Sequence, residues 1–271
     1  MATTPANAQT TQTTTVLREP RVYLVGRQMV DDEALGAFLG DHKVERWTTD
    51  TEEAGEKLVE VAGRLCYMSF ARPRPGGNHA YIEHLLGVGH GSVLEHAVFN
   101  FIIAGVSRSF THELIRHRAG FGYSQLSQRF VDESECEFVE PDAIAEDPEL
   151  HRIWLEAVET SQRAYRALAD GLTAKFATLE DKTLRRKKAR EAARSVLPNA
   201  TETKIFVTAN ARALRHFIEM RADPAADVEI RKVAVAVLKL LQAESPNLFG
   251  DYTVVDLSEG GQSATTPHHK V

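Results

Sequence analysis

Residues 116–129 read Arg-His-Arg-Ala-Gly-Phe-Gly-Tyr-Ser-Gln-Leu-Ser-Gln-Arg. The stretch sets two arginines and a histidine side by side, continues through a turn-forming segment, and ends in hydroxyl, amide and guanidinium groups without a carboxylate. A solvated helix face would include glutamate or lysine. Guanidinium groups offer planar pairs of N–H donors and stay charged at physiological pH, which matches them to phosphate oxygens. We therefore expect this stretch to bind anions.

Four other short segments accompany this motif. Gly89-His90-Gly91-Ser92-Val93-Leu94-Glu95-His96 precedes it, and Ala193-Arg194-Ser195-Val196-Leu197-Pro198, Asn210-Ala211-Arg212 and Met220-Arg221-Ala222-Asp223 follow it. Together with the Arg-His-Arg motif, in which eight residues separate Arg118 from Ser127, they resemble the signature of the flavin-dependent thymidylate synthases. The resemblance covers roughly residues 20–250, and the linked motifs make it far more specific than one motif alone.

Composition limits the class of protein. The chain has 271 residues, of which 43% are hydrophobic and 26% charged, and this fits one soluble globular domain with tails. Its net charge of -6 argues against a general nucleic-acid partner, because neutralising a phosphate backbone calls for a basic domain. Cys66 and Cys136 are too few for a disulfide framework, which favours a reducing, cytoplasmic location.

Both ends of the chain are expected to be disordered tails, over residues 1–18 and 256–271, around a single domain over 19–255. The first eighteen residues have neither the charged start nor the apolar run of a signal peptide. Residues 256–271 carry no apolar period. No stretch approaches the ~20 apolar residues of a membrane span, so we expect no membrane partner.

Hydrophobic periodicity predicts an α+β fold, with strands early and helices late. The expected strands are 22–25 and 97–106, and the expected helices are 31–39, 52–66, 81–88, 110–117, 151–176, 184–196 and 228–241. The resemblance implies the thymidylate synthase-complementing fold, a mixed sheet flanked by helices with a helical C-terminal half. It also implies a homotetramer with active sites shared between subunits.

The resemblance further implies a substrate site for dUMP. Arg129 and Arg194 would hold the phosphate, and Arg221 would lie against the pyrimidine as the catalytic residue that stabilises developing negative charge. The remaining expected substrate contacts are Glu113, Arg116, Gln125, Leu126, Ser127 and Gln128. For each arginine the simpler alternative is a solvated or ion-paired surface side chain.

FAD is the cofactor that the resemblance implies. Its expected contacts are Ser92, Arg116, His117, Arg118, Gln125, Asn210, Arg212 and His216. Taken alone, His117 would more often be an ordinary interfacial histidine. Asn210 has a second role open to it, as the cap of a helix that begins near Ala211.

Other reactive residues are assigned simpler roles. Ser127 has no base at local spacing, so it is interpreted as a binding hydroxyl and not as a nucleophile. Cys66 is expected to be a small buried residue near the flavin. His90 and His96 lie six apart, unlike the i, i+4 pair of a helical zinc site, and no metal site is predicted. The basic run over 184–190 is expected to be a solvated helix face.

The resemblance therefore implies reductive methylation of dUMP to dTMP, with 5,10-methylenetetrahydrofolate as carbon donor and NADPH as reductant through FAD. Two alternatives stay open. One is a flavin-dependent C5-methylase of another uridine nucleotide such as UMP, and the other is a non-catalytic nucleotide- or RNA-binding protein centred on the basic run. The chain departs from many relatives at Ala225, where they carry a histidine near the flavin.

Overall fold

A computed structural model describes residues 14–44, 47–72 and 74–270. The chain divides into two compact units, which we describe separately: Met1–Arg18 with Ser127–Glu202, called here the helical unit, and Glu19–Leu126 with Thr203–Val271, called the sheet unit. The helical unit is compact because the long helices between residues 148 and 193 pack chiefly on each other. The single domain expected over 19–255 stays a prediction beside this division.

The sheet unit is built on four strands in the order β2 (Arg21–Gly26), β3 (Val98–Ser107), β6 (Glu202–Asn210) and β4 (Phe121–Gln125). Strands β2 and β3 are antiparallel, with Tyr23 opposite Ile102, and β4 and β6 are antiparallel, with Tyr123 opposite Val207. The predictions of strands over 22–25 and 97–106 are confirmed.

Strand β6 was missed, because the second half of the chain was expected to be helical. Its side chains alternate between the two faces of the sheet: Ile205 and Val207 are buried, whereas Lys204 and Phe206 are exposed. This is the period of two that a strand with one buried face requires. The alternation is hard to see in the sequence, because apolar Phe206 lies on the exposed face and polar Thr203 on the buried face.

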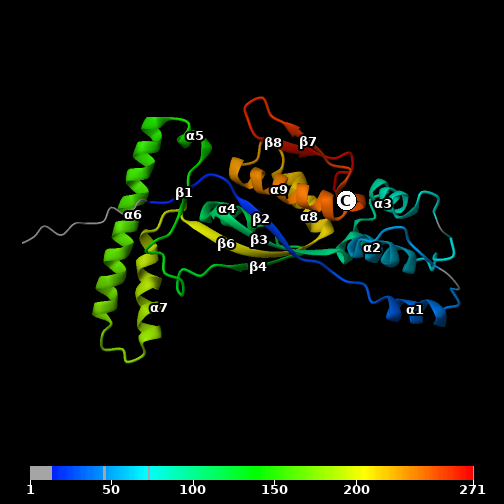
Figure 1. Cartoon of the computed structure of the whole chain (residues 1–271), viewed down its shortest axis with the longest axis horizontal. Helices are drawn as coiled ribbons and strands as arrows, with labels where there is room; N and C mark the ends of the chain where they lie inside the picture. The colour runs from blue at the N-terminus through cyan, green and yellow to red at the C-terminus, as the bar shows by residue number, and fades with distance from the viewer. Residues whose placement is uncertain (1–13, 45–46, 73, 271) are drawn as a thin grey trace, which may run out of the picture. The chain divides into compact units, whose positions relative to one another are not determined.

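Helices α8 (Ala211–Arg221) and α9 (Val228–Glu244) cover one face of this sheet (Figure 1). The main core lies between them and the strands, with Phe101, Ile205 and Phe217 among its fully buried side chains. Asn210 caps α8, since its side chain accepts a hydrogen bond from the Ala213 amide at 2.9 Å. The predicted capping role of Asn210 is therefore confirmed.

The remaining elements of the sheet unit are α1 (Asp32–Asp41), α2 (Ala54–Leu65), α3 (Gly77–Gly87), the 3-10 helix η1 (Gly91–His96), α4 (Arg108–Leu114), α10 (Pro246–Phe249), β7 (Thr253–Asp256) and β8 (Gln262–Thr265). These include the helices predicted near 31–39, 52–66, 81–88 and 110–117, and the helix predicted over 228–241 is α9. None of the helices that the structure describes has both the length and the apolar character needed to cross a lipid bilayer.

The expected C-terminal tail differs most from the prediction. Strand β8 pairs with β7 in an antiparallel hairpin, and Ser263 and Ala264 are buried. The Ala264 amide donates a 2.9 Å hydrogen bond to the Ala222 carbonyl just beyond α8. The buried side chains of Ser263, Ala264 and Thr266 are small, and backbone hydrogen bonds hold this segment, so it needs no apolar period.

At the other end, residues 1–13 of the predicted N-terminal tail lie outside the described residues. Within the same predicted tail, β1 (Val16–Leu17) pairs in parallel with β5 (Phe138–Val139) inside the helical unit. The structure therefore orders residues 16 and 17, which the polar composition of the preceding segment had concealed.

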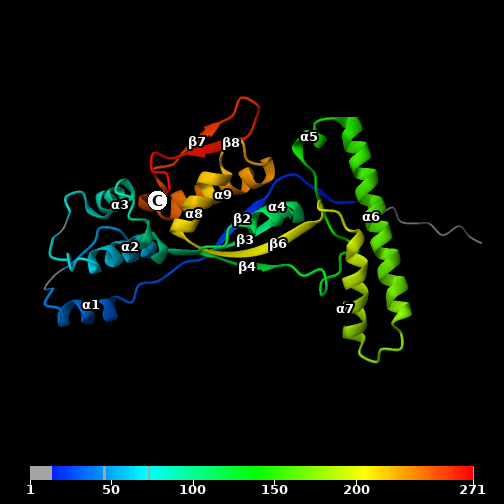
Figure 2. The same cartoon turned by 180° about the vertical axis from the view of Figure 1, so that it is seen from behind.

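The rest of the helical unit consists of α5 (Asp142–Ala145), α6 (Pro148–Lys175), α7 (Lys182–Ala193) and the 3-10 helix η2 (Arg194–Val196). Helices α6 and α7 run side by side (Figure 2), each begun by an aspartate cap, Asp147 and Asp181. The helices predicted over 151–176 and 184–196 are confirmed, with residues 194–196 in the tighter 3-10 form. The expected helix-flanked α+β fold is confirmed as well.

Candidate active site

The Tyr123 side chain on β4 holds the loop that carries the Arg-His-Arg motif. Its hydroxyl lies 2.6 Å from the His117 carbonyl and 3.0 Å from the Leu114 carbonyl, so it ties the end of α4 to the motif. Burial raises the pKa of Tyr123, which keeps the hydroxyl protonated and able to donate. This role of Tyr123 was not predicted, although the residue lies within residues 116–129.

Gly120 brings the same loop against the start of α8. Its φ is +73°, and a Cβ at this position would lie 2.8 Å from both the side-chain nitrogen of Asn210 (Nδ2) and the Ala213 Cβ. The Gly120 carbonyl accepts a hydrogen bond from the backbone N–H of Asn210 at 3.1 Å. Only glycine meets both demands, the left-handed backbone and the close approach.

Replacing Gly120 with alanine should therefore lower the free energy of unfolding by about 1–2 kcal/mol from the backbone alone, and further because the Asn210 side chain must shift. Urea unfolding of the two proteins measures this. Gly122→Ala is the matched control, since its nearest contact would be the Thr208 Cβ at an ordinary 3.8 Å. Equal losses in both variants would contradict the argument.

The motif and the end of α8 enclose a hollow of about 810 Å³, called here the motif hollow. Its lining residues are Arg116, His117, Arg118, Ala119, Phe121, His216, Met220 and Arg221. Predicted residues that lie about a hundred positions apart in sequence thus meet in one place. The guanidinium groups of Arg116, Arg118 and Arg221 make this hollow suitable for an anionic ligand.

Arg221 is held at two points. Its Nε donates to His117 Nε2 at 3.0 Å, and its Nη1 donates to Glu113 Oε2 at 2.9 Å. Because a guanidinium can only donate, His117 Nε2 must be the acceptor, and the ring proton of neutral His117 is on Nδ1. Glu113 and His117 together fix the plane of the guanidinium.

His117 is held in its neutral form. Burial, then the charge of Arg221, then that of His216 lower its pKa from 6.5 to about 4. The ring also packs edge-on against Phe217, with centroids 5.2 Å apart. The motif therefore presents two permanently charged side chains, Arg116 and Arg118, on either side of a neutral histidine.

Removing Arg221 as Arg221→Ala should raise the pKa of His117, yet leave it below 6.5, because burial is the larger cause. NMR titration of the histidine ring protons measures this shift. His216→Ala should raise the same pKa by less. An unchanged pKa in Arg221→Ala would contradict the contact.

The lowered pKa also sets the sign of the pH dependence of stability. Between about pH 4 and pH 6.5 the unfolded chain binds more protons at His117 than the folded one, so its contribution to the unfolding free energy rises with pH across this window.

A second hollow of about 480 Å³, called here the α8 hollow, lies next to the first, since Ala119 and His216 line both. It brings together the predicted flavin residues Asn210, Arg212 and His216. The Arg212 Nη1 pairs with Glu95 Oε1 of η1 at 2.6 Å. Ser92 is exposed on η1 and is not among the described residues that line either hollow.

Two further predicted residues lie where β4 ends. The Gln125 side-chain nitrogen lies 3.2 Å from the Thr111 hydroxyl and 3.3 Å from the Thr203 hydroxyl. Leu126 is fixed through its backbone, by a 2.9 Å hydrogen bond to the Lys204 carbonyl and a 3.0 Å hydrogen bond from Arg108. The threonines were missed by the sequence analysis, because single threonines in α4 and β6 carry no motif.

The predicted phosphate residues belong to the helical unit. Arg129 pairs with Glu191 of α7 at 2.8 Å, and Arg194 follows directly after α7. Both predicted phosphate arginines therefore lie at the same end of α7. Gln128 is buried, and among the described residues neither its Nε2 nor the Arg129 Nε has a hydrogen-bond partner. Buried donors of this kind need an acceptor, which fits a phosphate or nucleotide at this end of the unit.

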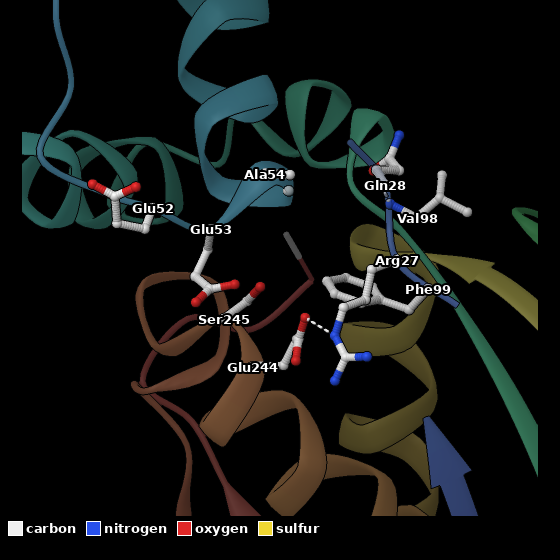
Figure 3. Close-up of a pocket in the computed structure, with 10 residues that line it drawn as sticks. Arg27, Gln28, Glu52, Glu53, Ala54, Val98, Phe99, Glu244 and Ser245 are labelled. Carbon is white, nitrogen blue, oxygen red and sulfur yellow. Dashed lines mark hydrogen bonds and ion pairs between the residues drawn. The ribbon is translucent and has the colours of Figure 1, made fainter. Parts of the chain in front are cut away.

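A smaller hollow of about 180 Å³ near α2 has more acidic than basic side chains in its lining, unlike the arginine-lined motif hollow (Figure 3). Glu52, Glu53 and Glu244 line it, and its one arginine, Arg27, is paired with Glu244. The carboxylates would repel a nucleotide phosphate. The motif hollow and the α8 hollow are therefore the better candidates for anionic ligands.

Two further predictions from sequence have different outcomes. Cys66 is exposed, not buried, because it lies just after the last residue of α2. The basic run lies on α7 as expected, with Arg186 and Lys188 exposed, Ala189 buried, and the Lys187 amine 4.9 Å from the Phe130 ring centroid. This arrangement is typical of a solvated helix face.

Comparison with known proteins shows the family to which the chain belongs. The family model described as "Thymidylate synthase complementing protein" matches residues 48–247, which include all five motifs. Flavin-dependent thymidylate synthases of Mycolicibacterium gilvum, Mycobacterium marinum and Mycobacterium tuberculosis are each 52% identical over 223 residues, covering 82% of this chain and 88% of each relative. The chain belongs to the flavin-dependent thymidylate synthase family.

Solved structures share the fold of this flavin-dependent thymidylate synthase family member. The UMP/dUMP methylase PolB from Streptomyces cacaoi, bound with 5-Br dUMP, has a TM-score of 0.65 at 21% identity, covering 87% of this chain and 95% of its own. The same methylase bound with 5-Br UMP has a TM-score of 0.63 at 20% identity, covering 88% and 95%. At this identity the likeness extends to the fold alone.

Proposed function

We propose that the protein catalyses the reductive methylation of dUMP to dTMP, with 5,10-methylenetetrahydrofolate as carbon donor and NADPH as reductant through FAD. The observation that carries this proposal is the motif hollow, which gathers Arg116, His117, Arg118, His216 and Arg221 in a chain that belongs to the family. A thymidylate synthase needs cationic and hydrogen-bonding groups around a nucleotide, and this hollow supplies them.

In this proposal two sets of residues contact dUMP, and because the active sites are proposed to be shared between subunits, the two sets need not belong to one chain. Arg129 and Arg194 bind its phosphate, each contact contributing about 1.5–3 kcal/mol net. Arg221 lies against the pyrimidine, and its charge stabilises the negative charge that develops on the ring in the transition state. Glu113, Arg116, Gln125, Leu126, Ser127 and Gln128 complete the proposed substrate contacts.

FAD, in turn, would be held by Ser92, Arg116, His117, Arg118, Gln125, Asn210, Arg212 and His216. The α8 hollow fits such a group, because its lining combines an arginine and an asparagine amide with the tight Gly120 backbone. The bound flavin supplies the hydride chemistry that no side chain can. The protein supplies binding, orientation and charge.

The chain's own contribution to catalysis is the fixed orientation of Arg221. Glu113 and neutral His117 accept its hydrogen bonds from two directions, so little reorganisation is needed when charge develops. Its side chain is only 21% exposed, which weakens solvent screening of its charge. A neutral His117 adds no repulsion to the guanidinium.

The direct test is turnover by the purified protein with FAD, NADPH and methylenetetrahydrofolate, with dUMP and UMP supplied in parallel and products identified by mass spectrometry. We expect dTMP as the main product. A higher turnover on UMP would favour the C5-methylase alternative. RNA affinity that falls steeply with salt, without flavin binding, would favour the non-catalytic alternative.

We also propose that the enzyme is a cytoplasmic homotetramer with shared active sites. One observation supports the assembly: Tyr23, Ile102 and Phe206, on the neighbouring strands β2, β3 and β6, are 47%, 37% and 38% exposed. An exposed apolar area on a sheet face is typical of a protein interface. The free thiols of Cys66 and Cys136 suit a reducing compartment.

Changing Ile102 to glutamate should therefore break the assembly, because a charge would be buried in an apolar contact. Size-exclusion chromatography with light scattering should give four 30.1 kDa chains for the wild type and fewer for Ile102→Glu. Met29→Glu is the control, since Met29 is 89% exposed and outside the four strands. A wild-type mass for Ile102→Glu would count against this interface.

A further inference from the structure

The chain after β8 returns along α8 in the sheet unit. The Ala264 amide donates a hydrogen bond to Ala222, the residue just beyond α8, and the red end of the chain lies beside α8 in both views (Figures 1 and 2). This part of the chain lies beyond residues 48–247, the range matched by the family model. Its position is set by two anchors on α8, Arg215 and Glu219, which both line the α8 hollow.

The first anchor is a buried ion pair. Arg215 of α8 is 1% exposed, and its Nη1 and Nη2 each lie 2.7 Å from an oxygen of Asp251. The Thr266 hydroxyl donates to the same carboxylate and accepts the His268 amide hydrogen at 3.0 Å. The ion pair therefore sets the backbone course of residues 266–268.

The second anchor is Glu219, one turn further along the same face of α8 as Arg215. Its Oε1 lies 3.0 Å from His269 Nδ1, and its Oε2 accepts the Lys270 amide hydrogen at 3.1 Å. Residues 269 and 270 are thereby held through a side chain and through the backbone. The side chain of Lys270 is left to point elsewhere.

His268 and Lys270 both line the α8 hollow, together with Asn210, Arg212 and His216. The two carboxylates of the lining are already engaged, Glu95 with Arg212 and Glu219 with the chain end. Within the described part of the chain, the His268 ring and the Lys270 amine have no hydrogen-bond partner. The hollow is thus lined by the exposed Lys270 ammonium group and by the Arg212 guanidinium, and neither carboxylate of the lining is hydrogen-bonded to the Lys270 amine.

We propose that the C-terminal segment 266–270 forms one wall of the cofactor site, in which Lys270, assisted by His268, binds the phosphate groups of the flavin dinucleotide. The inference rests on the proposed function. Lysine binds phosphate as a point charge, and an ammonium with no acid partner is suited to that task. The dUMP phosphate is assigned to Arg129 and Arg194, so the diphosphate of FAD is the anion for this hollow.

The test is the FAD dissociation constant of the full-length protein, measured by quenching of flavin fluorescence. Lys270→Ala should weaken FAD binding about tenfold, the equivalent of one charge-assisted contact. Lys270→Arg should restore most of the affinity. Lys188→Ala, which removes an exposed lysine of α7, is the matched control and should bind like the wild type. Thermal unfolding confirms that each variant is folded.

The outcomes separate the two proposals. If the wild type binds FAD and Lys270→Ala binds it equally well, the role of the chain end is wrong while the flavin site stands. If the wild type binds no FAD, both proposals fall. Weakened binding in Lys270→Ala and His268→Ala, with affinity for riboflavin unchanged, supports contact with the phosphate groups.

Discussion

Replacing Arg221 with alanine should lower kcat by about two to three orders of magnitude while FAD stays bound. One preorganised donor aimed at developing charge contributes about 10²–10³ in rate, and Arg221 is held for that purpose by His117 and Glu113. The loss should appear in kcat more than in KM, because the charge it stabilises is present only in the transition state.

Steady-state rates and the visible flavin spectrum measure the two parts of this prediction. Arg221→Lys is the informative control: it keeps a positive charge but cannot donate to His117 and Glu113 in one plane, so it should recover only part of the rate. Glu113→Gln should reduce the rate less than Arg221→Ala does, since the His117 contact remains. A near-normal rate in Arg221→Ala would remove this residue from the mechanism.

Asp251→Asn should lower the free energy of unfolding by about 3–5 kcal/mol, because it leaves the buried Arg215 guanidinium without a counter-charge. Asparagine keeps the size of the side chain, so the loss reports charge and hydrogen bonding and not a cavity. Urea unfolding measures it. Asp170→Asn, an exposed change on α6, is the control and should fall within ±0.5 kcal/mol of the wild type.

The ion pair of Arg215 and Asp251 also makes the free energy of unfolding depend on pH in the acidic range. Burial raises the pKa of Asp251, but the hydrogen bonds and charge of Arg215 outweigh it, and the pKa lies below 3.8. The stabilisation is therefore fully present above pH 3.8 and is lost as pH falls through the lowered pKa. The wild type should lose unfolding free energy below pH 3.8 more steeply than Asp251→Asn. Parallel acid curves would show that the pair contributes little.

The sequence predicted the elements whose apolar period is strong and unbroken. Strand β3 and helix α9 are of this kind, and both are present. Strand β6 was missed because apolar Phe206 lies on its exposed face and polar Thr203 on its buried face, and because its pairing with β4 joins residues about eighty positions apart. The hairpin of β7 and β8 was missed because it depends on small residues and hydrogen bonds, which have no hydrophobic signal.

The motifs predicted five of the residues that line the motif hollow, but not the protonation state or the hydrogen bonds of their side chains. Arg116, His117, Arg118, His216 and Arg221 meet as a shared site would require. That His117 is a neutral acceptor follows from burial and from Arg221 across the fold, and local sequence carries neither. The same limit applies to His268 and Lys270, whose place depends on Asp251, Arg215 and Glu219 and not on their neighbours in sequence.

The close approach of Gly120 to Asn210 has a consequence for how this chain can vary over generations. Asn210 caps α8, contacts the backbone of the loop at Gly120 and lines the α8 hollow. A substitution of Gly120 or Asn210 would therefore disturb the helix start, the loop and the lining of the hollow together. Single replacements there are expected to be eliminated, and any accepted change should come as a paired substitution.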